Sequence, residues 1–514
     1  MKVSDWSALS DGSEFDFAIV GSGFGGSVAA LRLAEKGYSV AVLEAGRHFE
    51  DADFPKTNWN APRYLWAPRL GCWGIQRIDL LEHALVLSGA GVGGGSLVYA
   101  NTLLEPSGAF YTEAAGLEPR FEEKLKTHLA TARRMLGATV TPRLFAADEE
   151  LKRAATELGR GESFSRATVG VYFGEAGRTV ADPFFDGRGP QRAGCRFCGG
   201  CMVGCRHNAK NTLAKNYLPL AVALGARVFA RSCAVRLADR PGGGLLVDVR
   251  RSGWGWTTKT LRARGLVVAA GVLGTMRLLQ NPDNAIGRLP PRLGRDVRTN
   301  GEALLGAFAR TGARDWSEGI AIASGVWVDE ETHVEPVRYP AGSDAMGLLG
   351  VARGAGLADR LRSAWPFGWA RRATVLLAMQ TRDSRLRLVL RAGGRLSSEP
   401  EPGYAPPSAR LPAAERLQQV FCRNSDAIAM TNVAEAWLGR SATAHILGGA
   451  CRAAGPEAGC TGPDGRLFGR RDLWIVDGSS VPANPGVNPS LTIAALAESA
   501  MAHVPAKGAP GAPA

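Results

Sequence analysis

Short, continuous apolar runs followed by glycine-rich turns recur along the chain, and each run predicts a buried strand of a parallel sheet. The first run, FDFAIV at residues 15–20, leads into GSGFGG and then into a helical pattern that ends at Gly37, a residue typical of a helix C-cap. A second run, SVAVLEAG, ends at Glu44, and similar runs begin at Leu266 and Leu473. This alternation predicts the α/β fold class, α+β when the whole chain is counted.

Two stretches of the chain lack this strand–turn–helix pattern. Within one of them, SGVWVDEETHVEPVRY alternates apolar and polar residues from Ser324 onward, as strands at a domain face do. We therefore expect a second, substrate-binding domain with a mixed sheet, made from residues 111–194 and 301–439. The first domain is expected to be discontinuous and to comprise residues 1–110, 195–300 and 440–506.

Two further segments have a biased composition. RLRSAWPFGWARRATVLLAM, which begins at Arg360, mixes aromatic, apolar and arginine residues, and we interpret it as half-buried core rather than as a lid that touches a membrane. The end of the chain is rich in proline, glycine and alanine. That composition predicts a disordered tail at residues 507–514.

Composition and charge narrow the function classes. The 514 residues are 45% hydrophobic and 21% charged, and the net charge of +13 comes from scattered arginines rather than from a basic run. This pattern argues against a nucleic-acid partner, although it allows a weak contact with an anionic membrane surface. The N-terminal segment has no apolar core of a secretory signal, and four of the nine cysteines lie in one cluster. We therefore expect a cytoplasmic protein without a disulfide framework.

The first glycine-rich turn has the features of a dinucleotide site in a Rossmann-like domain. Gly21 would allow the tight turn, Gly23 the approach of a pyrophosphate, and Gly26 the close packing of helix on strand. The free N–H groups at the helix N-terminus would face the phosphates. Glu44, at the end of the second strand, would accept hydrogen bonds from ribose hydroxyls. This unit alone does not separate NAD from FAD.

Later segments favour FAD. A second glycine-dense loop, LSGAGVGGGSLVYAN, is too rich in glycine for the interior of a strand or helix, so its amides could lie along a flat or anionic ligand. The strand LWIVDGSSVP ends in an aspartate that could hold a ribityl hydroxyl. A cofactor enclosed by segments so far apart is longer than a mononucleotide. The residues that we assign to FAD in these segments are Gly91, Gly94, Gly95, Ser96, Asn101, Asp477 and Gly478.

Two residues near the C-terminus are candidates for chemistry. His445 precedes a Gly-Gly pair in ATAHILGGA, and its ordinary pKa suits a base or proton relay near neutral pH. Asn488 lies just before a helix that is expected to start near Pro489. The dipole of that helix could stabilise negative charge on the pyrimidine edge of a flavin.

With these motifs in place, the whole chain resembles the glucose–methanol–choline (GMC) family of FAD oxidoreductases, and within it the bacterial cholesterol oxidase branch. The resemblance rests on GSGFGG with Glu44, GAGVGGGSLVYAN, HILGG and DGSSVPANPGVNPSLTIAALAE. It implies the GMC architecture and oxidation of a secondary alcohol by hydride transfer to flavin N5. The 3β-hydroxyl of a sterol such as cholesterol is the substrate that the branch suggests.

The resemblance also implies roles for three residues. His445 would bind and deprotonate the substrate hydroxyl, and Asn488 would orient that hydroxyl and the flavin edge. Glu335, by a shorter match, would move a proton in a Δ5→Δ4 double-bond shift, for which an apolar pocket must raise its pKa. The competing interpretation of Glu335 is a carboxylate that lies at the surface or forms an ion pair near Arg338.

Other functions remain open at this point. The same chemistry could act on another bulky hydrophobic alcohol or on a secondary-metabolite alcohol. A redox-neutral, flavin-bound isomerase would need Glu335 but no electron acceptor. A non-catalytic electron-transfer protein is the remaining alternative, against which His445 and Asn488 argue.

The segment CRFCGGCMVGCRH concentrates four cysteines, Cys195, Cys198, Cys201 and Cys205. Their C-x2-C-x2-C-x3-C spacing is that of bacterial ferredoxins, in which the fourth cysteine binds a different cluster. One [4Fe–4S] cluster here would use the first three thiolates with Cys205 or a remote thiol such as Cys72. Zinc and simple packing of buried thiols are the alternatives.

The cysteines bear on the electron acceptor. A cluster would carry electrons to an external carrier and make the protein a dehydrogenase, whereas without a cluster molecular oxygen is the natural acceptor. Lys210 and Lys215 follow the cysteine run, and we expect them to face solvent.

Overall fold

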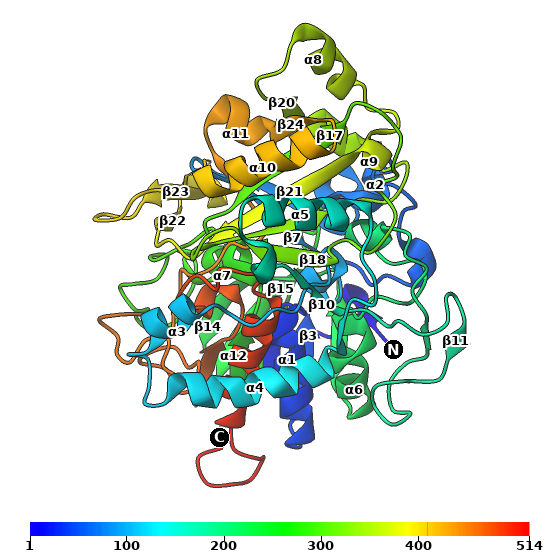
Figure 1. Ribbon diagram of the computed structural model, residues 1–514. Coiled ribbons are helices and arrows are strands. Elements are labelled where there is room, and N and C mark those ends of the chain that lie inside the picture. The colour runs from blue at the N-terminus through cyan, green and yellow to red at the C-terminus, as the bar shows by residue number, and fades with distance from the viewer. Residues whose placement is uncertain (409, 513–514) are drawn as a thin grey trace.

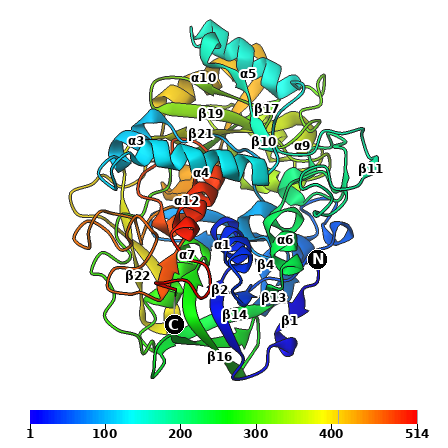
Figure 2. The ribbon, with the colours of Figure 1, turned by 90° about the horizontal axis from the view of Figure 1, so that it is seen from below.

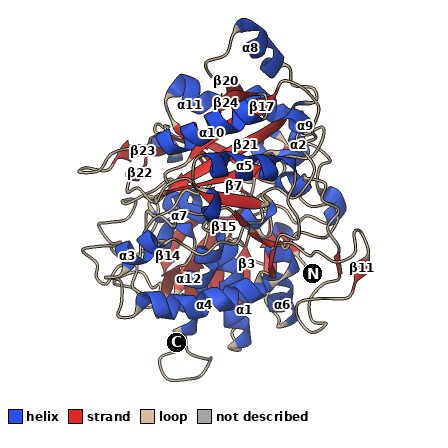
Figure 3. Ribbon diagram, viewed as in Figure 1, coloured by secondary structure: helices blue, strands red, loops and turns tan. Residues whose placement is uncertain are grey.

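The computed structural model describes residues 1–408 and 410–512, and its strands form two large sheets, one above the other, with helices on their outer sides (Figures 1 and 3). The first sheet has eight strands. In sheet order they are β1 (Ser4–Asp5), β13 (Arg227–Ala230), β3 (Val40–Leu43), β2 (Glu14–Val20), β16 (Thr258–Val268), β15 (Leu245–Arg251) and β14 (Ser232–Asp239), with β26 (Leu473–Ile475) also paired to β16.

The strands predicted from apolar runs form the parallel part of this sheet. From β1 to β16, and from β16 to β26, every neighbour is parallel, whereas β14 and β15 add an antiparallel edge. Alternate residues of β2 enter different cores: Phe17 and Ile19 on one face, Ala18 and Val20 on the other. Burial on both faces explains why the run is apolar without alternation, and the predicted strand is confirmed.

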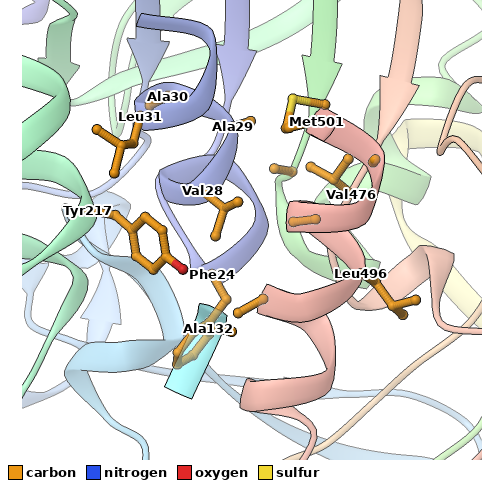
Figure 4. Close-up of a cluster of buried hydrophobic side chains, with 14 of the residues drawn as sticks. Phe24, Val28, Ala29, Ala30, Leu31, Ala132, Tyr217, Val476, Leu496 and Met501 are labelled. Carbon is orange, nitrogen blue, oxygen red and sulfur yellow. The ribbon is translucent and has the colours of Figure 1, made fainter. Parts of the chain in front are cut away.

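The helix predicted after the first strand is α1 (Phe24–Glu35), and Gly37 behind it has φ 84°. α1 packs against α12 (Ser490–Ala502) and α6 (Tyr217–Ala223), and α12 packs against α4 (Phe121–Met135). Seen from below, α4 runs across one end of α12 (Figure 2). The close-up in Figure 4 shows the side chains that these helices bury together.

The second sheet has seven strands and forms the core of the other half of the molecule. In order they are β20 (Gly350–Ala352), β24 (Ala427–Asn432), β17 (Ala303–Ala309), β21 (Ala373–Gln380), β19 (Thr332–Val337), β18 (Ser324–Trp327) and β9 (Ser165–Arg166). All neighbours are antiparallel, so the mixed pairing that we expected here lies in the first sheet instead. α5 (Ala146–Glu157) and α10 (Pro412–Asn424) cover its outer face.

Two segments lie outside the domain to which the sequence assigned them. α3 (Gly108–Ala114) and α4 fall mostly in the range 111–194, yet their apolar residues join the core around α1 and α12. The hairpin of β22 (Leu386–Leu390) and β23 (Leu396–Pro400) packs near α7 (Gly271–Leu279) in the first domain. In both cases the apolar face of the segment packs against helices of the first domain.

A small sheet links the two halves: β6 (Gln76–Leu80) pairs antiparallel with β7 (Ala84–Gly89), and β25 (Ser441–Thr443) pairs parallel with β7. The remaining elements are short. They are α2 (Ala61–Tyr64), β4 (Trp66–Ala67), β5 (Cys72–Trp73), β8 (Ala138–Val140), β10 (Thr168–Gly170), β11 (Thr179–Val180), β12 (Arg192–Ala193), α8 (Leu357–Ala364), α9 (Trp369–Arg372) and α11 (Val433–Leu438).

The segment from Arg360 onward divides between core and surface. β21 is buried, as expected, but α8 stands at the end of the molecule opposite the C-terminus (Figure 1), and Trp365 and Phe367 are each 64% exposed. In the C-terminal tail, Lys507 donates to Asp16 at 2.7 Å, so the predicted disorder does not begin at that residue, and residues 513–514 lie outside the described part. None of the helices in the described ranges has the length and apolarity to cross a membrane.

Candidate active site

The turn after β2 leaves open space at only one of its three predicted glycines. Gly21 has φ 97°, and a Cβ there would lie 2.2 Å from the Ala269 carbonyl oxygen. A Cβ on Gly26 would lie 2.0 Å from the Gly21 oxygen. A Cβ on Gly23 would meet no protein atom within 4 Å. Gly21 and Gly26 are therefore required by packing, whereas Gly23 leaves room above the N-terminus of α1.

The second glycine loop packs directly on the first. Gly94 has φ 51°, and a Cβ there would lie 2.7 Å from the Gly23 Cα. The Gly93 N–H donates to the Ser22 hydroxyl at 3.0 Å. Ser96 is fully buried, and its hydroxyl donates to the Gly93 carbonyl at 2.7 Å. The loop is thus held in one shape beside the start of α1, with Gly91 (φ 126°) at its turn and Gly95 next along the chain.

Glu44 connects these two loops. One carboxylate oxygen accepts hydrogen bonds from the Ser22 N–H at 3.1 Å and the Ser22 hydroxyl at 2.6 Å, and the other accepts from the Gly46 N–H at 2.8 Å. The side chain is 6% exposed. The Gly91 N–H also donates to the oxygen that accepts from Gly46, at 3.4 Å, so each carboxylate oxygen already accepts two hydrogen bonds and Glu44 ties the two loops together. The ribose contact expected of Glu44 stays a prediction.

The predicted residues at the end of β26 lie against the same helix start. A Cβ on Gly25 would lie 2.0 Å from the Val476 carbonyl oxygen, which places Asp477 and Gly478 directly beyond the first turn of α1. Asp477 is 5% exposed and accepts hydrogen bonds from Thr275 Oγ1 at 2.6 Å and from the Ser479 N–H at 2.9 Å. Burial raises the pKa of its carboxyl above the ordinary value.

These residues fit a dinucleotide cofactor. No side chain caps the N-terminus of α1, so its first N–H groups are free to face a phosphate. Asn101 has φ 72° and is fully buried, and neither polar atom of its side chain has a hydrogen-bond partner among the described residues. Buried polar atoms are normally satisfied, so Asn101, whose side chain lies beside the Cys201 thiol, has polar atoms left for a further group. FAD would be held by the loops that follow β2, β7 and β26.

His445 follows β25, which lies beside the strand that carries the second glycine loop. Its Nδ1 pairs with the Glu302 carboxylate, whose other oxygen accepts from the Ala444 N–H at 2.8 Å. The His445 N–H donates to Thr443 Oγ1 at 2.9 Å. Burial alone lowers the pKa of His445, but Glu302, and more weakly Glu335, raise it above the ordinary value.

Glu335 lies in β19 and is fully buried. Asn488 Nδ2 donates to its Oε2 at 3.1 Å, while Glu335 Oε1 and Asn488 Oδ1 have no hydrogen-bond partner among the described residues. His333 Nδ1 lies 3.8 Å from Glu335 Oε1. Burial raises the pKa of Glu335 to about 8, against the opposing effects of Asn488 and His445. The structure therefore brings the three predicted residues together, and two of them have polar atoms left for a ligand.

Comparison with known proteins identifies the family. GMC oxidoreductase family models match residues 190–296 and 386–497, and a model of the NAD(P)-binding Rossmann-like domain matches residues 19–49. A cholesterol oxidase of Mycobacterium tuberculosis is 40% identical, with 96% of this chain and 92% of that protein covered. The chain belongs to the GMC oxidoreductase family.

Further comparisons agree with this assignment. A cholesterol oxidase of Acinetobacter baumannii is 38% identical to this GMC oxidoreductase, over 96% of this chain and 95% of that protein. The structure of pyridoxine 4-oxidase from Mesorbium loti shares the fold, with a TM-score of 0.62 at 16% identity, over 95% of this chain and 98% of that one. The chain is an FAD-dependent alcohol oxidoreductase, and the predicted fold class is confirmed.

Three residues that lie next to His445, Asn488 and Glu335 in this GMC oxidoreductase were not predicted from the sequence. Glu302 positions His445 through its pairing with the ring Nδ1. Asn300 has φ 55° and clamps the loop before Asn488, because its Nδ2 donates to the Val487 carbonyl at 3.0 Å and its Oδ1 accepts from the Gly486 N–H at 3.2 Å. His333 is buried two residues before Glu335. The polar run TNGE directly before the apolar strand β17 was the one available signal for Glu302 and Asn300.

The competing interpretation of Glu335, an ion pair with Arg338, is wrong. The Arg338 guanidinium instead pairs with Asp148 at 2.8 Å, and both side chains are fully buried. Glu335 thus has no arginine partner and faces His445 and Asn488 instead.

The four clustered cysteines of this GMC oxidoreductase line one cavity of about 400 Å³. The described residues contain no set of three or more His, Cys, Asp or Glu side chains arranged to hold a single metal ion. Cys72 does not line the cavity, so it is not the remote ligand that the sequence suggested. The expectation that both lysines face solvent is also wrong, because Lys210 is buried and Lys215 pairs with Asp51 at 3.1 Å.

Proposed function

We propose that this enzyme oxidises a secondary alcohol on a bulky apolar molecule, the 3β-hydroxyl of a sterol such as cholesterol being the expected substrate. The two relatives named cholesterol oxidase support the substrate class. The observation that carries the proposal in the structure is an apolar cavity on the same sheet face as Glu335.

This cavity is linked to Glu335 by strand register. Glu335 is paired with Leu377 on β21, and Leu377 is paired with Leu304 on β17. Leu304 lines the cavity, together with Gly306, Val375, Met430 and Trp369. Paired residues in neighbouring strands point to the same face of a sheet. A row of side chains therefore leads from the proposed catalytic carboxyl to an apolar recess.

The dimensions of the recess suggest how a sterol would lie. The cavity measures about 100 Å³, which is less than the roughly 300–1,000 Å³ of ordinary ligand pockets. It would hold only the far part of a hydrocarbon skeleton, with the hydroxyl end extending along the row toward Glu335. At the rim, Ile78 is 46% exposed and Leu349 is 36% exposed, so an apolar substrate would meet apolar residues on entry.

The proposed chemistry divides between the cofactor and the side chains. FAD, when bound, accepts the hydride that leaves the carbinol carbon. Glu302 holds Nδ1 of His445, so Nε2 is the nitrogen left to take the hydroxyl proton. Asn488 would orient the alcohol oxygen through its unpartnered Oδ1.

Glu335 would move a proton when the product carries a Δ5 double bond. As a carboxylate it would take the proton at C4, and as a carboxylic acid it would return one to C6. A buried carboxyl whose pKa is raised to about 8 passes between these forms near physiological pH.

Product analysis tests this proposal. The enzyme supplied with cholesterol in air is expected to give cholest-4-en-3-one, identified by its conjugated-enone absorbance and by mass spectrometry, with hydrogen peroxide or a reduced carrier as co-product. The 3α epimer is the matched control and should not react. Equal turnover of both epimers, or turnover of small alcohols only, would exclude a sterol-oxidising role.

The weak contact with an anionic membrane stays a prediction. The surface of α8 and the residues just after it is apolar, with side chains that are 64% exposed or more: Leu357, Leu361, Trp365 and Phe367. The same helix carries Arg360 and Arg362. Such a surface could rest on an anionic bilayer and receive an apolar substrate from it. Co-sedimentation with anionic vesicles should fall when Trp365 and Leu361 are replaced by glutamate, and equal binding of this variant would remove α8 from the contact.

A further inference from the structure

The cysteine run, which the proposed function does not use, lines a cavity that is too large for packed core. Protein interiors have few voids larger than one water molecule. The cavity of about 400 Å³ is instead bordered by Cys195, Cys198, Cys201 and Cys205. Cys195 and Cys201 are buried, while Cys198 is exposed at the surface. The four thiols thus surround a space that reaches the outside.

The loop that carries the cysteines is fixed around this space. Phe197 has φ 53° and Gly199 has φ 68°, so the chain turns sharply between the thiols. Two backbone hydrogen bonds hold the turn against Gly319. The Gly199 N–H donates to the Gly319 carbonyl at 2.7 Å, and the Gly319 N–H donates to the Phe197 carbonyl at 2.8 Å. The Phe197 N–H donates to Cys195 Sγ at 3.4 Å. Hydrogen bonds from N–H groups to cysteine sulfur are a feature of iron–sulfur sites.

A buried cation beside the cavity has no carboxylate partner in the part of the chain that the structure describes. Lys210 is 2% exposed, and its Nζ donates to the carbonyls of Leu97, Tyr99 and Cys201 at 2.8–2.9 Å. A buried charge is normally paired. Lys210 itself lines the cavity, so a negatively charged occupant there would supply the missing partner.

The same lysine connects the cavity with the second glycine loop. Leu97 and Tyr99 belong to that loop, and Cys201 belongs to the cysteine run, so a single ammonium group bridges the two segments. Asn101, with its two unpartnered polar atoms, lies two residues beyond Tyr99. A group in the cavity would therefore lie next to the segment proposed to hold FAD.

We propose that Cys195, Cys198, Cys201 and Cys205 bind one [4Fe–4S] cluster in this cavity and that the cluster carries electrons from alcohol oxidation to a one-electron carrier protein. The electron route rests on the proposed function, whereas cluster binding does not. Oxidation of one alcohol releases two electrons and two protons. The two electrons leave in successive single transfers through the cluster, each reducing one carrier molecule, and the protons pass to solvent.

Zinc fits the same residues less well. A zinc ion needs four ligands that converge on one point, and the described residues contain no such group. In a [4Fe–4S] cluster each thiolate binds a different iron, so the sulfurs surround the cluster without converging. Lys56, Arg196, Arg206 and His207 also line the cavity and suit a negatively charged occupant.

Metal analysis of the anaerobically purified, full-length protein is the test. We expect about four iron and four acid-labile sulfide per chain, together with an electron paramagnetic resonance signal after dithionite reduction. Iron-free protein with normal FAD content, or zinc in place of iron, would overturn the proposal. This measurement needs no variant, so it decides whether a cluster is bound even if substitutions of the cysteines prevent folding.

Variants then assign the ligands. Cys198→Ser and Cys201→Ser should lose most of the iron and the resonance signal while retaining FAD. Cys72→Ser, whose thiol lies outside the cavity, is the matched control and should keep both. Retention of iron in both cavity variants would contradict the assignment. Anaerobic reduction of FAD by alcohol is followed separately, so iron without alcohol-dependent reduction would refute the proposed function and leave the cluster intact.

Discussion

At the scale of single residues, the pair formed by His445 and Glu302 has the clearest chemical consequence. A histidine that acts as a base must be neutral, and Glu302 raises its pKa above the ordinary value. The sequence indicated His445 because a glycine pair follows it, but Glu302 is distant in sequence by more than a hundred residues. The two side chains meet because β25, which precedes His445, pairs with β7 and lies close to the start of β17, which follows Glu302. The residues around His445 in the sequence therefore could not have predicted this partner.

Replacing His445 with alanine should slow the reduction of FAD by alcohol by about 10²-fold or more, as for loss of a general base. Stopped-flow absorbance of the flavin measures this rate. In the wild type the rate should increase as pH rises through the pKa of His445. Glu302→Gln removes the carboxylate that raises this pKa, so the rising limb should move to lower pH.

Glu330→Gln is the control for this shift, because Glu330 has a side chain that is 92% exposed and lies near Arg160. Its pH profile should match that of the wild type. A Glu302→Gln profile that keeps the wild-type midpoint would show that Glu302 does not set the protonation of His445.

Glu335→Gln should spare oxidation and block the double-bond shift, so that cholest-5-en-3-one accumulates. In the wild type the isomerisation rate should rise with pH through about 8, because the carboxylate must first take a proton. Unchanged formation of the Δ4 product in the variant would show that another group moves the proton.

The same carboxyl should affect stability. Its folded-state pKa of about 8 exceeds the ordinary 4.5, so stability that is fully present below pH 4.5 is lost as pH rises from there through about 8. The melting temperature of Glu335→Gln should therefore fall less between pH 6 and pH 9 than that of the wild type. Equal decreases would mean that Glu335 titrates normally.

At the scale of elements, the sequence predicted the parallel strands well and the domain boundaries less well. Strands buried on both faces leave an unbroken apolar run, which β2 and β3 show. The amphipathic helix α4 has a recognisable apolar face, but nothing local says which domain covers that face. Its packing against α12 is determined by tertiary structure, which the local pattern within residues 111–194 does not reveal.

The glycines at the start of α1 allow packing to be separated from cofactor binding. Gly23→Ala adds a methyl group to open space, so the protein should fold normally but bind FAD at least roughly tenfold more weakly. Gly26→Ala places the methyl group against the Gly21 carbonyl and should cost about 1–3 kcal/mol of stability. Thermal melting and FAD titration measure the two effects. Normal FAD affinity in Gly23→Ala would contradict the proposed position of the pyrophosphate.

At the scale of the whole molecule, the two sheets carry different parts of the proposed active site. The first sheet presents the residues that fit the cofactor, and the inner face of the second carries Glu335 and the apolar cavity. The sequence suggested both halves, but it could not predict the register that aligns Glu335, Leu377 and Leu304. Register depends on pairing between strands that are not adjacent in the chain.

Filling the cavity should discriminate substrates by size. Leu304→Phe places a larger side chain between the cavity and Glu335, which should raise KM for cholesterol about tenfold, in line with overpacking costs of about 1–3 kcal/mol. A small secondary alcohol in the same variant is the internal control, and its KM should change little. Equal changes for both substrates would mean that the cavity does not hold the sterol skeleton.

The most direct test of the central claim is anaerobic mixing of the FAD-loaded enzyme with a 3β-hydroxysteroid while the flavin absorbance is recorded. The account predicts that the oxidised flavin band disappears, that one 3-ketosteroid forms per flavin, and that His445→Ala slows both changes equally. A flavin that stays oxidised while the steroid double bond migrates, or that is bleached at the same rate in His445→Ala, would contradict it.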